Sequence, residues 1–344
     1  MGESSIGFML RAIELSRRGY PAPNPRVGCV IVNDGAIVGE GWHDHAGGDH
    51  AEIVAIKKAG TRAKGARAYC TLEPCNHEGR TPPCSRAIID AQIKEVTFAA
   101  ADPNPVAAGG GDALERTGIV VHRGLLRREA VAANEVFMTA VERRRPFVVC
   151  KSAQTTDGFI ARDDGTSKWI TCEESRLQGH RLRAELGCVL VGRITIERDD
   201  PELTARIEGV KNQPVRAVID PDARLSSEYR VFRAPGTPIR FVRKGVAAQS
   251  YDCEVDVTAD GLDLVQVLAA LYSKGVIGVL AEGGGRTISS FLRARLVDRL
   301  ELFVSPKVFG SGRPWLGDSP PQFELELLRE SKIGEDTWRT YAPR

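Results

Sequence analysis

The sequence predicts an α/β protein of two domains, the first of them a three-layer α/β domain. Its 344 residues are enough for two domains of ordinary size, each with its own hydrophobic core. Short runs rich in β-branched residues alternate with segments of helical apolar spacing throughout, as in α/β proteins. Arg143-Arg144-Arg145 and Pro146 close the first set of elements. We therefore place the domains at residues 1–145 and 146–344.

Composition and charge exclude several classes of protein. The 47 basic residues nearly balance the 45 acidic ones, for a net charge of +2, so nothing global indicates binding to nucleic acid or an anionic membrane. No stretch reaches transmembrane length, and the N-terminus lacks a continuous signal-peptide core. The eight cysteines are scattered through a large chain, which favours a reducing cytoplasm with most cysteines as core residues.

The first half begins with apolar residues at helical spacing between positions 4 and 18. Two β-branched runs, 27–32 and 36–38, flank Asn33-Asp34-Gly35, which is a strong hairpin signal. Asn24 precedes the first of these strands and His43 follows the second, so both could face a pocket at the sheet edge. The remaining elements expected in this half are a helix at 50–59, strands at 69–72, 96–101 and 119–121, and a helix at 125–141.

Between His50 and Cys84 the sequence predicts a catalytic zinc site. Catalytic zinc takes three nitrogen or sulfur ligands from the protein and keeps a fourth position for water, and His50, Cys75 and Cys84 leave that position open. Glu52 lies two residues from His50 and could reach a metal-bound water as a general acid/base. His-Ala-Glu and Pro-Cys match the zinc deaminase signature, but residues 76–83 separate the cysteines more widely than that signature does.

The expected secondary structure supports this hypothesis. His50 and Glu52 fall in the first turn of a helix, and Pro82-Pro83 places Cys84 at the start of another, where a thiol pKa is lowered. One alternative is that the segment holds only two buried cysteines and a capping histidine. It would not explain why Glu52, the Pro-Cys turn and two ligand-bearing helix starts occur together. A more serious alternative is a structural zinc site closed by His77 or His43, although it would leave Glu52 without a role.

The second half repeats the alternation of strands and helices. Thr171 and Glu174 predict a capping box at the head of a helix that runs to about Leu186. A compact polar segment, made up of Thr195, Asp199-Asp200-Pro201, Leu203 and Arg206, is too rich in charge to be core. The other elements expected here are strands at 147–151, 188–192, 215–220, 239–242 and 276–280, and a helix at 262–272.

A glycine-rich turn, Glu282-Gly283-Gly284-Gly285, links the last of these strands to a further helix. Such a turn suits a phosphate, because helix N-terminal amides attract anions and glycine lets a ligand approach the backbone. The glycine order is neither G-x-G-x-x-G nor a P-loop, and turns of this kind without a ligand are about as common. The hydroxyls of Thr287, Ser289 and Ser290 and the charge of Arg286 favour the phosphate interpretation.

Several of these motifs together resemble the bifunctional deaminase/reductases of riboflavin biosynthesis. In the first half the resemblance rests on His50-Ala-Glu52, Thr71-Leu-Glu-Pro-Cys75, Gly79-Arg-Thr-Pro-Pro-Cys84 and Asp102-Pro-Asn-Pro. In the second half it rests on Arg145-Pro-Phe, Asp157-Gly, Ser167-Lys-Trp-Ile-Thr171, Leu182-Arg-Ala184, Asp199-Asp-Pro201, Glu282-Gly-Gly and Pro306-Lys. It covers nearly the whole chain, and the wide spacing of the two cysteines becomes a feature of the family.

The resemblance implies two activities. A cytidine-deaminase-like domain would use zinc to hydrolyse an amino group from a pyrimidine that carries a phosphoribosylamino side chain. A dihydrofolate-reductase-like domain would then use NADPH to reduce the ribosyl group to ribityl. Partners would be small-molecule substrates, with no nucleic acid and no membrane, and a homo-oligomer is plausible for this family.

The same matching assigns residues to both sites. In the deaminase, zinc would be held by His50, Cys75 and Cys84, Glu52 would be catalytic, and the substrate would be bound by Asn24, His43 and Arg80. The cofactor contacts of the reductase would be Ala153, Trp169, Thr195, Asp199, Gly284, Gly285, Arg286, Thr287, Ile288, Ser289 and Ser290. Its substrate contacts would be Ser167, Arg183, Leu203, Arg206 and Glu282, and the candidate proton donors are Lys151 and Asp200.

Two alternatives from other classes stay open at this point. A nucleic-acid deaminase with an RNA-binding appendage would need a basic face and stacking aromatics, and aromatics are only 6% of the chain. A non-catalytic metabolite sensor with structural zinc would give Glu52 no role.

Overall fold

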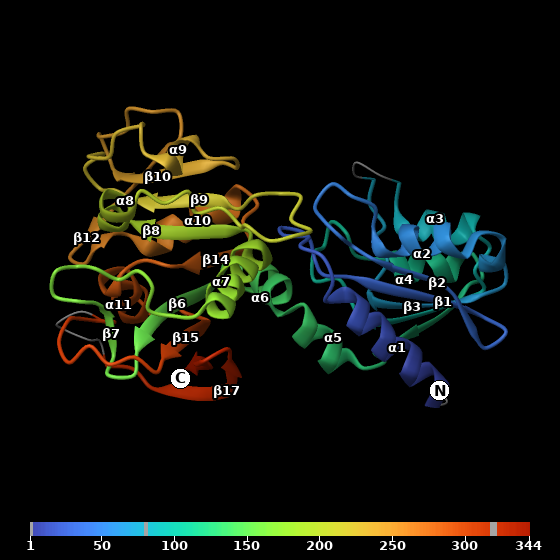
Figure 1. Ribbon diagram of the computed structural model, residues 1–344. Helices are drawn as coiled ribbons and strands as arrows, with labels where there is room; N and C mark the ends of the chain where they lie inside the picture. The colour runs from blue at the N-terminus through green and yellow to red at the C-terminus, as the bar shows by residue number, and fades with distance from the viewer. Residues whose placement is uncertain (1–2, 79–81, 317–321) are drawn as a thin grey trace. The chain divides into compact units, whose positions relative to one another are not determined.

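A computed structural model describes residues 3–78, 82–316 and 322–344. The chain forms two compact units, Met1–Arg143 and Arg144–Arg344, and each is built around its own β-sheet (Figure 1). None of the described helices is long and apolar enough to cross a membrane.

The first unit contains a five-stranded sheet in the order β2-β1-β3-β4-β5. Strand β1 is antiparallel to both of its neighbours, whereas β3, β4 and β5 run parallel. The strands are β1 (Gly28–Asn33), β2 (Ala36–Trp42), β3 (Arg67–Leu72), β4 (Glu95–Ala100) and β5 (Val120–Arg123). The helices are α1 (Glu3–Ser16), α2 (Ala51–Ala59), the 3₁₀ helix η1 (Gly60–Ala63), α3 (Cys84–Asp90), α4 (Gly110–Arg116), α5 (Arg127–Ala133) and α6 (Glu135–Arg143).

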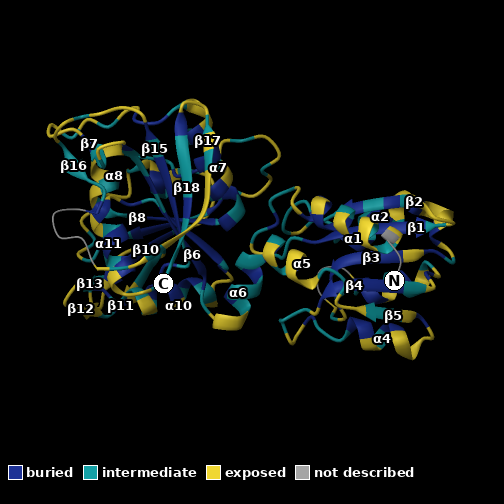
Figure 2. Cartoon of the chain, turned by 90° about the horizontal axis from the view of Figure 1, so that it is seen from below, coloured by how far each residue is buried: buried dark blue, intermediate teal, exposed yellow. Residues whose placement is uncertain are grey.

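Helices cover this sheet on both faces, which gives the three-layer α/β domain predicted from the sequence. Two glycines allow the close packing: a Cβ on Gly28 would lie 2.0 Å from the Ala12 carbonyl oxygen of α1, and one on Gly41 would lie 2.0 Å from that of Ala51 in α2. Buried residues make up most of the central strands β3 and β4 (Figure 2). This close packing places the start of α2 beside the sheet.

Two local predictions in this unit have different outcomes. The hairpin is confirmed, because Asp34 and Gly35 both have positive φ, at 48° and 78°, as a tight turn between antiparallel strands requires. The single helix expected at 125–141 is wrong, because the chain forms α5 and α6 on either side of Asn134. The Asn134 side-chain oxygen accepts a hydrogen bond from the Arg26 backbone N–H at 3.0 Å, a tertiary contact that sequence periodicity does not contain.

The second unit contains a nine-stranded sheet in the order β11-β10-β9-β8-β14-β6-β15-β18-β17. Neighbouring strands from β11 to β15 are parallel, and β18 and β17 add an antiparallel edge. The strands of this sheet are β6 (Phe147–Thr155), β8 (Cys188–Gly192), β9 (Val215–Ile219), β10 (Pro238–Arg243), β11 (Asp252–Val255), β14 (Gly278–Ala281), β15 (Arg299–Ser305), β17 (Leu325–Ile333) and β18 (Asp336–Pro343).

Smaller elements surround this sheet. Two short antiparallel pairs join β7 (Phe159–Ala161) to β16 (Arg313–Pro314) and β12 (Val257–Thr258) to β13 (Gly261–Leu262). The helices are α7 (Glu173–Leu186), α8 (Arg193–Asp199), α9 (Arg230–Arg233), α10 (Leu264–Ser273) and α11 (Gly285–Arg293). Buried residues of α10 and α11 form one core with the sheet, and Ile196 of α8 belongs to a second core with β8 and β9.

The predicted capping box at the head of α7 is wrong. The helix begins at Glu173, and its N-cap residue Cys172 makes no capping hydrogen bond through its side chain. Instead Asp336, at the start of β18, accepts hydrogen bonds from the Cys172 backbone N–H at 2.8 Å and the Ser175 hydroxyl at 2.6 Å. A carboxylate from a distant strand therefore binds the start of this helix.

The charged segment after Asp199 is also more buried than its composition indicates. Leu203, Thr204 and Ala205 are 3%, 6% and 2% exposed, and Leu203 packs with the core of β8 and β9. The charged side chains beside this centre form ion pairs, such as that between Asp200 and Arg230. The prediction that this segment lies outside the core is therefore wrong for its centre.

Candidate active sites

Three separate segments bring the predicted zinc ligands together. His50 is the N-cap residue of α2, Cys75 follows β3, and Cys84 is the first residue of α3. His50 Nδ1 lies 3.2 Å from Cys84 Sγ and 3.5 Å from Cys75 Sγ. In the part of the chain that the structure describes, no other three His, Cys, Asp or Glu side chains bring their ligand atoms within 4.8 Å of one another.

The spacing and chemistry of these three atoms fit a zinc ion. Ideal tetrahedral zinc separates a nitrogen and a sulfur ligand by about 3.5 Å, close to both distances. The Cys84 thiol donates to Cys75, and together with the His50 ring and the Cys84 backbone N–H this lowers the pKa of Cys75 to about 4. A thiolate is the form of cysteine that binds metal. The donor set is thus prepared for a cation.

Neither of the two histidines proposed as a fourth ligand belongs to this group. Both ring nitrogens of His43 are already engaged, Nε2 with the Asn24 amide at 2.9 Å and Nδ1 with the Asp49 carbonyl at 2.9 Å. His77 lines the adjacent cavity but lies outside the three-residue group. The arrangement favours a site with an open position over a closed structural one.

A cavity of about 420 Å³ is lined by two of the three ligands, His50 and Cys75, and by Glu52. Glu52 is the second residue of α2 and is 4% exposed, and burial, with the nearby Cys75, raises the pKa of its carboxyl to about 7. The sequence placed both His50 and Glu52 in the first turn of the helix. In the structure His50 is the N-cap residue, immediately before α2 begins at Ala51, and Glu52 lies in the first turn.

Asn24 and His43 also line this cavity, from the two ends of the β1–β2 hairpin. Because the Asp49 carbonyl can only accept, His43 Nδ1 carries the proton and Nε2 accepts from the Asn24 amide. Burial lowers the pKa of His43, which keeps the ring neutral. The amide of Asn24 is therefore oriented by a fixed partner. Arg80 lies outside the described residues.

The second unit has a larger cavity, of about 990 Å³, at the carboxyl ends of its parallel strands. Gly192 ends β8, Ile219 ends β9 and Glu282 follows β14, and all three line it, as expected for a ligand site in an open α/β sheet. The predicted residues that line this cavity are Lys151, Ala153, Ser167, Thr195, Asp199, Glu282, Gly284, Gly285, Arg286, Thr287 and Ser290.

The start of α11 fits the phosphates of a dinucleotide. Gly284 is its N-cap residue, and a Cβ there would meet nothing within 4 Å, so a ligand can reach the backbone. A Cβ on Gly283 would lie 2.4 Å from that of Thr287, so this position requires glycine. The N-terminal amides of a helix attract phosphate, and Arg286 adds a positive charge at the cavity.

Other predicted residues lie outside the lining of this cavity. Ser289 donates its hydroxyl to the Leu316 carbonyl, and Ile288 is part of the core. Trp169 is 64% exposed, with the Arg176 guanidinium 4.7 Å from its ring centre. The predicted residues that do not line the cavity are Trp169, Arg183, Asp200, Leu203, Arg206, Ile288 and Ser289.

Some lining residues were not foreseen. Arg193 and Arg198 come from α8, directly after β8, and a rule that ligands bind at the carboxyl ends of strands would have pointed to them. Thr258, Asp260 and Leu262 come from the small β12–β13 hairpin, whose position no sequence pattern indicates.

A buried cluster of charge lies at the edge of the larger cavity. Arg183 pairs with Glu282 through two hydrogen bonds, from Nη2 at 2.6 Å and from Nε at 3.1 Å. Burial opposes ionisation of Glu282, but Arg183 and Lys151 outweigh it and hold its pKa below the usual range. Burial lowers the pKa of Lys151, which makes this amine a better proton donor than an exposed lysine.

Both units match known families. Residues 3–100 match the zinc-binding region of cytidine and deoxycytidylate deaminases, and residues 146–338 match the RibD C-terminal domain. A riboflavin biosynthesis protein RibD of Aquifex aeolicus is 42% identical over 97% of both chains. The corresponding protein of Escherichia coli is 36% identical over 96% of both.

Solved structures agree over the whole chain. Acinetobacter baumannii RibD superposes with a TM-score of 0.90, at 34% identity over 99% of both chains. A Thermotoga maritima deaminase/reductase superposes with a TM-score of 0.86, at 36% identity over 99% of both. Fold and site thus define a zinc-binding deaminase joined to an NADPH-dependent reductase. The chain belongs to the RibD family of bifunctional riboflavin-biosynthesis enzymes.

Proposed function

We propose that residues 1–145 deaminate 2,5-diamino-6-(5-phosphoribosylamino)pyrimidin-4-one and that residues 146–344 reduce the ribosyl chain of the product to ribityl. One observation carries the first half of this proposal: the buried Glu52 carboxyl lines the same cavity as His50 and Cys75, two of the three zinc-type donors. The second half is supported by the larger cavity, which joins a phosphate-type helix start to the Lys151 and Glu282 side chains.

In the deaminase, His50, Cys75 and Cys84 would hold the zinc ion. When bound there, zinc would supply a Lewis acid that lowers the pKa of water. Glu52 would take a proton from the water that attacks the amino-bearing ring carbon and pass it to the departing amine, which leaves as ammonia while the ring keeps the oxygen. Asn24 and His43 orient the pyrimidine, and Arg80 binds the phosphate.

In the reductase, bound NADPH would supply the hydride for the first carbon of the ribosyl chain, and the protein would supply a proton to the oxygen released there. Lys151 is the better of the two candidate donors, because it lines the cavity and its pKa is lowered. Asp200 lies outside the cavity lining and is paired with Arg230.

The remaining residues would bind cofactor and substrate. We assign the NADPH phosphates to the α11 start, Gly284 to Thr287, together with Ser290. Other cofactor contacts would be Ala153, Trp169, Thr195, Asp199, Ile288 and Ser289, the last two supporting the turn from behind. Substrate contacts would be Ser167, Arg183, Leu203, Arg206 and Glu282, with the arginines suited to the ribose phosphate.

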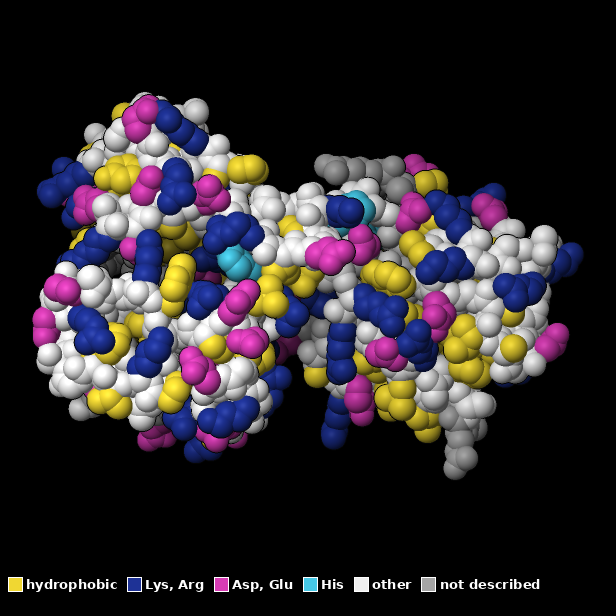
Figure 3. All heavy atoms as spheres, viewed as in Figure 1, with side chains coloured by type: hydrophobic (Ala, Val, Ile, Leu, Met, Phe, Trp, Pro, Cys, Tyr) yellow, Lys and Arg dark blue, Asp and Glu magenta, His cyan; other side chains and the backbone are white. Residues whose placement is uncertain are grey.

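The nucleic-acid alternative would need a basic face. On the face shown in Figure 3, Lys and Arg side chains are interspersed with Asp and Glu. All eight cysteines are free thiols, which supports our inference of a cytoplasmic location. We also propose a homo-oligomer, which light scattering of the purified protein would test.

The deaminase assignment is tested by two variants with opposite effects on zinc. Glu52→Gln should keep one zinc per chain and lose ammonia release by at least about a hundredfold, as expected for loss of a general acid/base. Cys75→Ser should lose the metal as well as the activity. Full deamination by the zinc-loaded Glu52→Gln protein would disprove the role of this carboxyl.

A further inference from the structure

The segment Leu203–Arg206 is held in an unfavourable backbone conformation. Leu203 has φ of 57°, in the left-handed region that residues with a β-carbon rarely occupy, and its side chain is 3% exposed. Such a conformation persists only where surrounding contacts impose it. The contacts that impose it therefore also set where the following residues, including Arg206, are presented.

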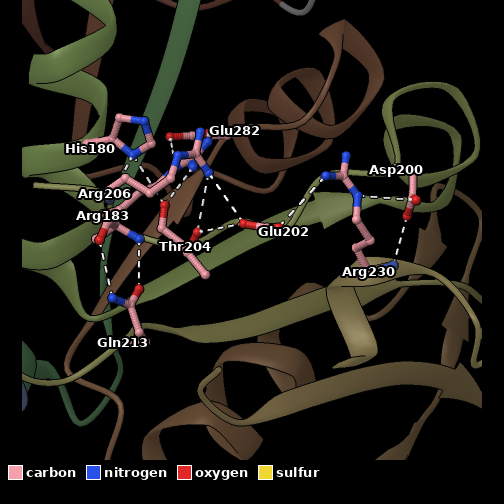
Figure 4. A network of polar contacts seen from close by, with 10 residues as sticks. His180, Arg183, Asp200, Glu202, Thr204, Arg206, Gln213, Arg230 and Glu282 are labelled. Carbon is pink, nitrogen blue, oxygen red and sulfur yellow. Dashed lines mark hydrogen bonds and ion pairs between the residues drawn. The ribbon is translucent and has the colours of Figure 1, made fainter. Parts of the chain in front are cut away.

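One set of contacts comes from α7 (Figure 4). Arg183 donates from Nη1 to the Thr204 carbonyl at 2.9 Å while its other nitrogens bind Glu282. His180 Nδ1 lies 3.2 Å from the same carbonyl and 3.3 Å from the Arg206 backbone nitrogen. The helix thus ties the Thr204 peptide to the charged cluster beside the larger cavity.

A second set comes from one side chain on the opposite side of the segment, Gln213. Its Oε1 accepts from the Ala205 backbone N–H at 2.9 Å, and its Nε2 donates to the Ala205 carbonyl at 3.2 Å. This pair of hydrogen bonds satisfies both backbone groups of one residue, as a neighbouring strand would. Gln213 immediately precedes Pro214 and β9, so it is anchored to the sheet.

We propose that Gln213 is a positioning residue for the phosphate end of the reductase substrate. By fixing Ala205 it sets the backbone from which Arg206 extends. The Arg206 side chain is 59% exposed, and apart from weak contacts with Thr204 and Glu202 it is available for an anion. This inference rests on the proposed function, which gives Arg206 the ribose phosphate.

The test compares substrate and cofactor kinetics in the full-length enzyme. The reaction is the oxidation of NADPH with 5-amino-6-(5-phosphoribosylamino)uracil supplied directly, so deamination does not enter. Gln213→Met keeps the length of the side chain and removes both hydrogen bonds. It should raise KM for this substrate about tenfold, because the segment that presents Arg206 loses both of its hydrogen bonds to the Gln213 side chain. Both kcat and the KM for NADPH should stay within about twofold.

Four further proteins complete the design: three single variants and one double variant. Lys211→Met, an exposed change in the same loop, should behave as wild type. Gln213→Glu keeps the acceptor but not the donor and should raise KM less than Gln213→Met. Arg206→Ala alone should raise KM, and adding Gln213→Met to it should change KM little further, because both act through the same contact.

Each outcome decides the matter. An unchanged substrate KM in Gln213→Met, or a kcat and NADPH KM that change as much as the substrate KM, would overturn the positioning role. Effects of Gln213→Met and Arg206→Ala that multiply independently would also overturn it. If the wild-type enzyme oxidises no NADPH with this substrate, the proposed function itself fails, which is a distinct result.

Discussion

Arg183 and Glu282 form a buried ion pair across 99 residues of sequence, with side chains only 16% and 10% exposed. Removing one partner leaves a buried charge uncompensated, which costs about 3–5 kcal/mol, whereas removing both costs less. We expect Arg183→Met to lower the free energy of unfolding by about that amount and the double variant Arg183→Met/Glu282→Gln to recover much of it. Urea denaturation measures both. Strictly additive losses would show that the pair is not coupled.

His180 should stay neutral well below the pH at which an exposed histidine is protonated. Burial, followed by the charges of Arg183 and Arg206, lowers its pKa to about 4, with Glu282 and the Thr204 carbonyl opposing. Between the unfolded pKa of about 6.5 and pH 4 the unfolded chain binds a proton that the folded chain does not. The free energy of unfolding therefore falls as the pH drops from about 6.5 to 4, and His180 causes no such loss above about pH 6.5.

A histidine-resolved NMR titration of the full-length protein measures this pKa directly. The Arg206→Ala variant should raise it, because one of the two positive charges is gone. A His180 pKa near 6.5 in the wild-type protein would contradict the arrangement of charges described around it.

Asp336 should matter for stability more than its position in a C-terminal strand indicates. It accepts hydrogen bonds from the Cys172 backbone N–H and the Ser175 hydroxyl at the start of α7, which carries His180 and Arg183. Asp336→Ala should lower the free energy of unfolding by about 1–3 kcal/mol, because these two donors lose their acceptor. The neighbouring exposed Glu335→Ala serves as the control. Equal stability of the two variants would count against this role.

The zinc site could be predicted from sequence because its chemistry is local. His50 and Glu52 are two residues apart in sequence. Cys84 begins a helix directly after two prolines, and Cys75 follows a strand. Each ligand is thus presented by an element that its neighbours in sequence specify. The three-layer fold followed for the same reason, from strands and helices that alternate in a regular way.

The features that sequence reasoning missed all depend on tertiary contacts. Nothing near residue 171 indicates that Asp336 will bind the start of α7, and nothing near Asn134 indicates that Arg26 will bind it. The burial of Leu203 within a charged segment is hidden for the same reason. Gln213 reads as an ordinary loop residue until the structure places it against Ala205.

The protein is proposed to deaminate its substrate first and to reduce the product second, and one experiment tests this order most directly. Zinc-loaded protein is given the diaminopyrimidine substrate with and without NADPH, while ammonia and NADPH absorbance are followed separately. We predict ammonia release in both cases, and loss of NADPH absorbance that begins only after ammonia has appeared. Glu52→Gln should show neither signal with this substrate, yet should oxidise NADPH normally when given the deaminated product. Oxidation of NADPH by that variant with the diaminopyrimidine itself would contradict the account.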